Sequence, residues 1–193
     1  FGVILDQMAE AGAVAIEWSV VDAQHWVPQR RKRVFVIAIF DPATAERCPN
    51  PLLPFSKSLP GHLAKGKLKR QSAARTFTKG VGTDGAITNV EPMLIDGTRV
   101  NDVRIYKPPV QTLKERMGTG GNNVPQILES TMAIRKLTPL ECERLMGWPD
   151  NHTKWKADGT EQADTHRYKQ CGNGVASPVA QWIGKHLIKL GQQ

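Results

Sequence analysis

The sequence predicts an α/β protein, and three features of its 193 residues support that prediction. An apolar, periodic segment at the start ends at Gly12 and is typical of a helix. Two runs rich in Val and Ile follow, at 13–23 and 33–40, and are typical of strands. Near the end, apolar residues recur at helical spacing between Val179 and Leu190. A chain of this length can bury a substantial core.

The first region, residues 1–40, is therefore expected to contribute one helix and two strands. The second strand run, RVFVIAIF, has no polar residue between its first and last positions. An unbroken apolar run is typical of a strand in the middle of a sheet that is covered on both faces.

A basic cluster stands directly before that run, in VPQRRKRVFVIA. On a strand, Gln29, Arg31 and Arg33 project to one face, whereas Arg30 and Lys32 project to the other. Arginines anchored at a sheet edge can hold a carboxylate or a base carbonyl in fixed geometry. A solvated basic face and a targeting signal are the alternatives, although a nuclear localisation run is expected on a flexible polar segment.

The second region, from residue 41 to about 130, is rich in Pro, Gly and basic residues. Between Arg47 and Thr83 there are eight Lys or Arg residues and no acid. This stretch is either a mobile solvated loop or an electrostatic footprint for phosphates. Short strands are expected within the region, as in PMLIDGTRV, where Asp96 and Gly97 suit a hairpin turn.

Two glycine-rich segments of this region need separate interpretations. GVGTDG at 80–85 matches a dinucleotide-binding pattern, but no apolar strand precedes it, so loop glycines are the better interpretation. In MGTGGNN, Gly118, Gly120 and Gly121 follow Arg116, and bare amides beside a cation suit close approach to a phosphate backbone. An ordinary flexible turn is the alternative.

The third region, residues 131–193, has two clear helix starts. Thr138 is expected to cap the first helix, with Glu141 completing a capping box and Gly147 ending the helix. Ser177 is expected to cap the second helix, with Pro178 at its first position. The second helix would be a packing element at the end of the chain.

Charge and composition limit the function further. The formal net charge of +8 and the isoelectric point of about 9.6 favour a polyanionic partner. The three cysteines and five histidines show no ligand spacing, so neither a metal site nor a disulfide framework is expected, and a reducing compartment fits. Cys171 is expected to be a small apolar filler rather than a nucleophile, because no base is placed beside it by motif.

Targeting segments are not evident in the sequence. No apolar run approaches the roughly 18 residues of a membrane span. The first apolar stretch contains Asp6 and Glu10 and does not resemble a signal peptide. The chain opens with Phe1 rather than Met, which favours a truncated protein over a complete one.

Four segments together resemble motifs of the DNA cytosine-5 methyltransferases, particularly bacterial and phage ones. They are similar to that family in content and in order, and they cover nearly the whole chain. They are DAQHWVPQRRKRVFVIA with its Gln-x-Arg-x-Arg pattern, QTLKERMGTGGNNVP with its Thr-Leu pair, RKLTPLECERLMGWPD, and YKQCGNGVASPVAQWIG.

The resemblance implies a fold and a division into domains. The fold would be the C-terminal portion of a Rossmann-like S-adenosylmethionine-dependent methyltransferase domain, with an inserted small target-recognition domain of strands and loops. Residues 1–40 would hold the last helix and strands of the catalytic domain, and 41–128 the DNA-binding domain. Residues 129–193 would return to the catalytic domain with a closing helix.

The resemblance also implies roles for single residues. Arg33 would bind a cytosine flipped out of duplex DNA and steady a catalytic glutamate, and Arg31 would brace the same site. Asn173, Gly174 and Val175 would line the pocket for S-adenosyl-L-methionine. The expected DNA-binding residues, near phosphates and base edges, are Thr112, Arg116, Gly118, Gly120, Gly121 and Asn122.

Two departures from the family pattern matter. Cys171 stands where the family often has an aromatic residue. The Phe-x-Gly-x-Gly, Pro-Cys and Glu-Asn-Val motifs, which carry the cofactor site, the nucleophile and the catalytic glutamate, are missing from this sequence. By this interpretation the chain is a truncated or split portion that is inactive alone and needs an N-terminal half, in the same chain or as a separate subunit.

Three other functions stay open at this point: a DNA-binding module without catalysis, an RNA cytosine-5 methyltransferase of the same fold, and a structural domain with incidental charge. Under the favoured interpretation the partner is double-stranded DNA, with no membrane. The location would be the cytoplasm of a bacterial or phage-infected cell.

Overall fold

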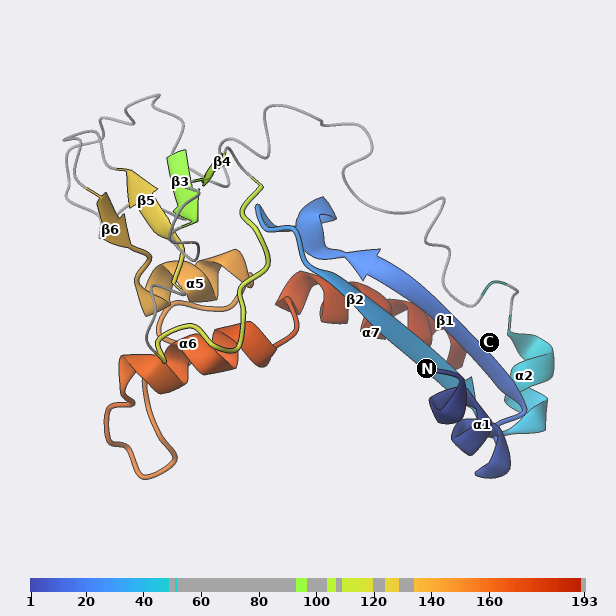
Figure 1. The fold of residues 1–193 in the computed structure, drawn as a ribbon. Coiled ribbons are helices and arrows are strands. Elements are labelled where there is room, and N and C mark those ends of the chain that lie inside the picture. Colours follow the sequence, from blue (N-terminus) through green and yellow to red (C-terminus); the bar gives the residue numbers. More distant parts are fainter. Residues whose placement is uncertain are drawn as a thin grey trace.

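The protein is described by a computed structural model that covers residues 1–48, 51, 93–96, 104–106, 109–119, 124–128 and 134–191 (Figure 1). In chain order the helices and strands are α1 (Gly2–Glu10), β1 (Ala15–Asp22), the 3-10 helix η1 (Ala23–His25), β2 (Lys32–Ile39), α2 (Pro42–Arg47), β3 (Met93–Asp96), β4 (Arg104–Tyr106), β5 (Gln126–Leu128), β6 (Ile134–Lys136), α5 (Pro139–Leu145), α6 (Asp164–Asn173) and α7 (Ser177–Gly191). Within these residues, no helix has the length and apolar character that crossing a membrane requires.

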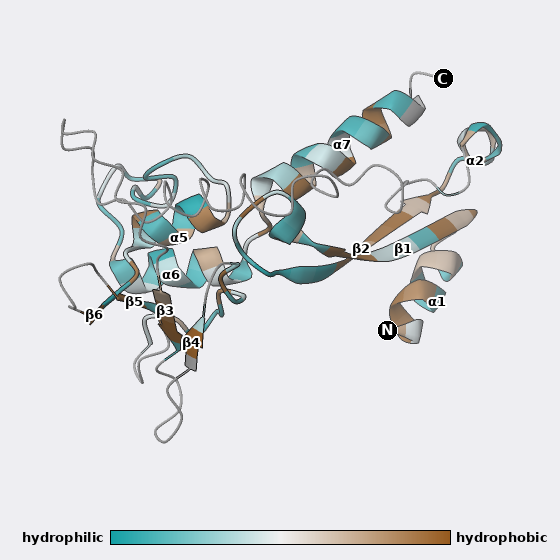
Figure 2. Ribbon diagram, turned by 90° about the horizontal axis from the view of Figure 1, so that it is seen from above, coloured by the Kyte–Doolittle hydropathy of each residue, from teal (hydrophilic) through white to brown (hydrophobic). Residues whose placement is uncertain are grey.

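The two apolar runs form the strands β1 and β2, as predicted, and these strands pair with each other as a long antiparallel hairpin. Val20 lies opposite Val34, and Trp18 lies opposite Val36. Helix α7 runs along one face of the hairpin, and α1 lies at the other face near the far end of the strands (Figures 1 and 2). Among the described residues β2 pairs only with β1, so the expected position in the middle of a covered sheet is not observed here.

A second sheet is formed by four short antiparallel strands in the order β4-β3-β5-β6. The predicted turn at Asp96 and Gly97 is wrong, because Asp96 pairs with Arg104. A two-residue turn there would set Ile95 opposite Thr98. The observed register sets it opposite Ile105 instead, and such an apolar cross-strand pair stabilises a sheet better.

The predicted start and end of α5 are confirmed. Thr138 Oγ1 accepts a hydrogen bond from Glu141 N at 3.2 Å, and Thr138 N donates to Glu141 Oε2 at 2.7 Å, which is the reciprocal capping box. Gly147 follows the helix with φ of 66°, a left-handed conformation that glycine adopts without steric cost. Helix α7 also lies in its predicted region, although Ser177 is its first residue and not the capping residue before it, and α6 was not predicted.

One buried cluster joins the two sheets to the helices. Its most deeply buried members come from the segment 109–119, from α5 and its flanks, and from α6, and they are Leu113, Met117, Leu137, Cys142, Leu145, Met146 and Cys171. Phe35 of β2 and Ile183 of α7 pack against its margin. The 109–119 segment therefore passes through the centre of the described fold.

Candidate functional site

Arg31, at the start of β2, is the largest fully buried side chain of the described residues, with 1% of its surface exposed. Its Nη2 donates to Gly172 O at 2.7 Å and to Gly174 O at 2.6 Å. Its Nη1 donates to Leu113 O at 3.1 Å. Burial and the nearby charge of Arg33 lower the pKa of Arg31 to about 10, with a smaller opposing effect from Cys171. The guanidinium therefore links the start of the second hairpin strand to the 109–119 segment and to the end of α6.

Gln29 is equally buried and lies beside this junction. With its side-chain amide oriented to satisfy both neighbours, its oxygen accepts from Leu113 N at 2.7 Å and its nitrogen donates to Leu145 O at 3.3 Å. Arg30 and Lys32, in contrast, are exposed. The predicted alternation of faces is thus confirmed for these four positions.

Arg33 follows Arg31 on the same face of β2, opposite the buried Val21. Its side chain is exposed, and Nη1 donates to Lys32 O at 2.9 Å. Arg31, Arg33, Phe35 and Val175 all line one small cavity of about 10 Å³ between the hairpin and the start of α7. Of the two arginines at this cavity, Arg33 is exposed and Arg31 is buried.

The turn 173–175 connects α6 to α7. Trp148 Nε1 donates to Val175 O at 3.0 Å, and a Cβ on Gly174 would come within 2.5 Å of Trp148 Cη2. Only glycine fits this close approach. Asn173 and Gly174 also line an open hollow of about 440 Å³, together with Gln162, His166, Lys169 and Gln170.

Three of the six expected DNA-binding residues lie in the part of the chain that the structure describes: Thr112, Arg116 and Gly118. Thr112 Oγ1 donates to Arg30 O at 2.7 Å, which ties the 109–119 segment to the basic cluster before β2. Arg116 is exposed, and Gly118 O accepts a weak hydrogen bond from Thr165 Oγ1 at 3.4 Å. Gly120, Gly121 and Asn122 lie outside the described residues, as do the glycine pattern at 80–85 and most of the basic stretch from Arg47 to Thr83.

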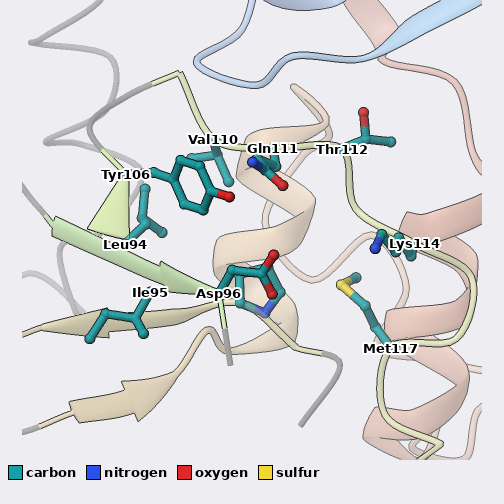
Figure 3. A pocket seen from close by; sticks show the side chains of 10 residues that line it. Leu94, Ile95, Asp96, Tyr106, Val110, Gln111, Thr112, Lys114 and Met117 are labelled. Carbon is teal, nitrogen blue, oxygen red and sulfur yellow. The ribbon is translucent and has the colours of Figure 1, made fainter. Parts of the chain in front are cut away.

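A cavity of about 40 Å³ lies between the second sheet and the 109–119 segment (Figure 3). Leu94, Ile95 and Met117 supply apolar walls, while Tyr106 and Gln111 turn toward each other. The volume suits about one water molecule and is too small for a nucleobase. This cavity is therefore a packing space beside the segment rather than a base pocket.

A buried ionic network stabilises the helices on which the site is built. Glu143 of α5 accepts hydrogen bonds from Arg167 Nη2 at 3.0 Å, from Thr153 N at 2.9 Å and from the Thr153 hydroxyl. Burial alone would raise the pKa of Glu143, but these hydrogen bonds outweigh it and lower that pKa. Sequence reasoning missed this network because its members are far apart in the chain and no local motif marks them.

The cysteine expectation agrees with the structure. Cys171 is fully buried, and burial and the charge of Glu143 raise the pKa of its thiol to about 12. Burial also raises the pKa of Cys142 well above its ordinary value. Neither thiol is a reactive thiolate at neutral pH. The described residues contain no cluster of His, Cys, Asp or Glu that could hold a metal ion.

Comparison with known proteins assigns the chain to a family. The family model of the C-5 cytosine-specific DNA methylase matches residues 1–189. A type II methyltransferase from Bacillus sp. (strain RFL6), M.Bsp6I, is 44% identical over 78 residues, which are 40% of this chain and 23% of the relative. M.HpaII, a type II methyltransferase from Haemophilus parainfluenzae, is 27% identical over 213 aligned residues, with 94% of this chain and 53% of the relative covered.

The fold agrees with a solved methyltransferase structure. The Entamoeba histolytica methyltransferase EhMeth matches with a TM-score of 0.50 at 16% identity, covering 98% of this chain and 57% of that one. Its fold and the mixed helices and strands described here fit an α/β methyltransferase. The chain spans about half the length, or less, of these relatives. On the family match over residues 1–189, this chain belongs to the C-5 cytosine-specific DNA methylases.

Proposed function

We propose that this chain is the C-terminal part of a DNA cytosine-5 methyltransferase. The complete enzyme would transfer a methyl group from S-adenosyl-L-methionine to carbon 5 of a cytosine flipped out of duplex DNA. The observation that carries this proposal is the family match over residues 1–189, since it includes the arginine pair, the 109–119 segment and the turn 173–175. The relatives' printed names, type II methyltransferases, agree with it.

The division into domains is part of the proposal. Residues 1–40 and 129–193 would belong to the catalytic domain, which would be Rossmann-like in the complete enzyme, and 41–128 would form the target-recognition domain. The described strands β3, β4 and β5 lie in the proposed recognition domain, and β6 extends their sheet from the next region. The small antiparallel sheet supports the proposed inserted domain.

Arg33 is the proposed catalytic residue of this chain. Its exposed guanidinium could donate hydrogen bonds to the carbonyl of a flipped cytosine and to a glutamate supplied by the N-terminal half. Its exposure at the end of the hairpin supports this role, because the guanidinium is accessible to a base and to a glutamate from outside this chain. The nucleophilic cysteine and the glutamate would come from the N-terminal half.

The turn 173–175 is the proposed contribution of this chain to the cofactor pocket. The hollow beside Asn173 and Gly174 is open, and the residues around it include side-chain amides and the ammonium of Lys169. These groups fit a ligand that carries a carboxylate and several hydrogen-bonding groups, as S-adenosylmethionine does. The cofactor supplies an activated methyl group, and this chain would bind and orient it.

The proposed DNA contacts lie on the 109–119 segment and the residues after it. Thr112, Arg116 and the backbone around Gly118 would contact phosphates and position the duplex, together with Gly120, Gly121 and Asn122. The net charge of +8 supports a nucleic-acid partner. The cytoplasm of a bacterial or infected cell is the proposed location.

The exposed apolar face of the hairpin supports the proposal that the complete enzyme has an N-terminal half. Trp18, Val20 and Val34 lie on one face of β1 and β2 and are 51%, 54% and 49% exposed. Neighbouring apolar residues of such exposure are typical of an interaction surface. The N-terminal half, as part of the same chain or as a separate subunit, would cover this face.

A chimera tests the proposed function. The part of M.HpaII that precedes its match to this chain is joined to Phe1, and the product is incubated with duplex DNA and S-adenosylmethionine. Nucleoside analysis should then detect 5-methylcytosine, whereas the 193-residue chain alone should produce none. A folded chimera that binds duplex DNA without methylating it would favour a non-catalytic module, and methylation of transfer RNA in preference to DNA would favour an RNA enzyme.

A further inference from the structure

Arg31 connects two segments that carry different parts of the proposed function. Its guanidinium donates to Leu113 O in the proposed DNA-binding segment and to Gly172 O and Gly174 O beside the proposed cofactor turn. These acceptors are 82, 141 and 143 residues from Arg31 in sequence. The three bonds therefore hold together parts of the chain that have no local reason to stay adjacent.

The two segments also pack directly on each other. A Cβ on Gly172 would lie 2.5 Å from Glu115 N, so the backbones approach as closely as a glycine allows. Further along the contact, Lys169 Nζ lies 3.7 Å from Glu115 Oε1, and Thr165 donates to Gly118 O. A displacement of the 112–118 segment would consequently displace the C-terminal end of α6.

Arg31 is itself held rigidly. Its backbone N donates to Asp22 Oδ1 at 3.0 Å, and its carbonyl oxygen accepts from Ala23 N at 3.0 Å. Gln29 holds Leu113 N from the same face of the strand. The guanidinium is thus presented from the end of the hairpin, and not from a mobile loop.

The energetics favour a role that needs the guanidinium shape and not only its charge. Among the described residues, Arg31 has no carboxylate partner, and its Nε has no hydrogen-bond partner. Burying a cation is costly unless hydrogen bonds compensate, and here carbonyl groups supply them. A lysine ammonium is a compact point charge and cannot reproduce the planar fork that reaches both segments.

We propose that Arg31 is a positioning residue that fixes the 112–118 segment and residues 172–174, at the end of α6, as one unit. The DNA contacts of the 112–118 segment and the cofactor contacts at the end of α6 are then held at a constant distance from each other. Arg31 touches neither ligand in this assignment and acts through backbone carbonyls. This inference rests on the proposed function for the identity of the two ligands, but not for the existence of the unit.

Two measurements on the full chain test the inference, with Arg31→Lys as the variant and Arg30→Lys as the matched control. Both substitutions keep the charge, but only Arg31 is buried. Deuterium uptake at 112–118 and at 172–175 should rise about tenfold or more in Arg31→Lys, with α5 nearly unchanged, because the Arg31 guanidinium bonds to the first two segments and not to α5. Duplex binding should weaken about tenfold or more in Arg31→Lys and stay at the wild-type level in Arg30→Lys.

Unchanged uptake at both segments, or uptake raised equally throughout the chain, would overturn the inference. Faster uptake at both segments with wild-type duplex affinity would overturn the link between the unit and DNA binding. If the wild-type chain itself binds no duplex DNA at low salt while Arg31→Lys loosens both segments, the proposed function fails and the unit stands.

A second variant covers the case in which Arg31→Lys does not fold. Gln29→Met removes the contacts to Leu113 N and Leu145 O without removing a charge. It should raise uptake at 112–118, leave 172–175 protected by Arg31, and weaken duplex binding. Equal uptake at 112–118 in Gln29→Met and wild type would contradict the proposed anchoring.

Discussion

The first unit of the described structure consists of α5, α6 and residues 109–119, and its buried polar groups are paired and its apolar side chains are covered. Glu143, with no exposed surface, is hydrogen-bonded to Arg167 and Thr153, and Leu113 and Met117 are fully buried. The hairpin of β1 and β2 differs. One of its faces is packed on α7 and the central cluster, whereas the other exposes Trp18, Val20 and Val34.

This difference separates what the chain can do alone from what it needs a partner to do. The first unit, which carries the proposed DNA segment and cofactor turn, has its own core and its own ionic network. The hairpin, which carries Arg33, has an apolar face that an additional structural element would stabilise. Under the proposed function, we therefore expect DNA binding by the chain alone and catalysis only in the completed enzyme.

The largest expected effect is on the first unit. Glu143→Gln removes the buried charge opposite Arg167 and leaves that guanidinium with only the exposed carboxylate of Asp164, 3.7 Å away, which should lower the free energy of unfolding by about 3 kcal/mol. Urea unfolding at pH 7 measures this loss in the free energy of unfolding. Asp150→Asn is the control, because its ion pair with Arg144 is partly exposed and should contribute less than about 1 kcal/mol. Equal losses in the two variants would contradict the description of the network.

The next largest effect is expected at Arg33 of the hairpin, where a substitution should impair catalysis without destabilising the chain. Arg33→Ala in the completed enzyme should cost about 3 kcal/mol of transition-state stabilisation, as the loss of a positioned donor commonly does. The same change should alter the stability of the 193-residue chain by less than about 0.5 kcal/mol, since the side chain is exposed. Comparing kcat/KM with unfolding data checks both values. A mild kinetic effect, similar to that of Arg30→Ala, would count against the proposed role.

A smaller effect concerns the exposed face. Val20→Ser should weaken association with a separately produced N-terminal half by about 2 kcal/mol, the value of burying one such side chain. Titration calorimetry measures the affinity. Lys156→Ser, on a distant exposed turn, should leave the affinity unchanged. If both variants bind as the wild type does, this face of the hairpin is not the contact surface.

The smallest effect is expected at the start of α5. Thr138→Ala removes the capping hydroxyl and should destabilise the chain by about 1 kcal/mol. Because Thr138 lies in the first unit, the loss should be equal in the chain alone and in the completed enzyme. A loss seen only in the completed enzyme would show that the first unit also depends on the other half.

The sequence predicted those features that depend on neighbours in the chain. The capping box at Thr138 and Glu141 and the alternation of Gln29, Arg30 and Arg31 follow from local geometry, and both are confirmed. The carbonyl groups that Arg31 binds come from distant segments, so no local pattern could reveal them. Arg31 and Arg33 look equivalent in the sequence, and only the tertiary structure separates the buried side chain from the exposed one.

Two other differences have similar causes. Helix α6, DTHRYKQCGN, is mostly polar, and its place depends on Arg167 and Cys171 being buried against other segments. The turn predicted at Asp96 and Gly97 used local turn preference, but the pairing of Ile95 with Ile105 decides the register. In both cases tertiary contacts outweigh the local signal.

The proposed function requires that an N-terminal half covers the exposed apolar face of the hairpin. Deuterium uptake at residues 15–22 and 32–39, measured with and without a separately produced N-terminal half, tests this most directly. The account predicts a strong decrease in uptake at both strands upon addition, with little change at α5. Unchanged uptake at both strands, under conditions in which the mixture methylates DNA, would contradict it.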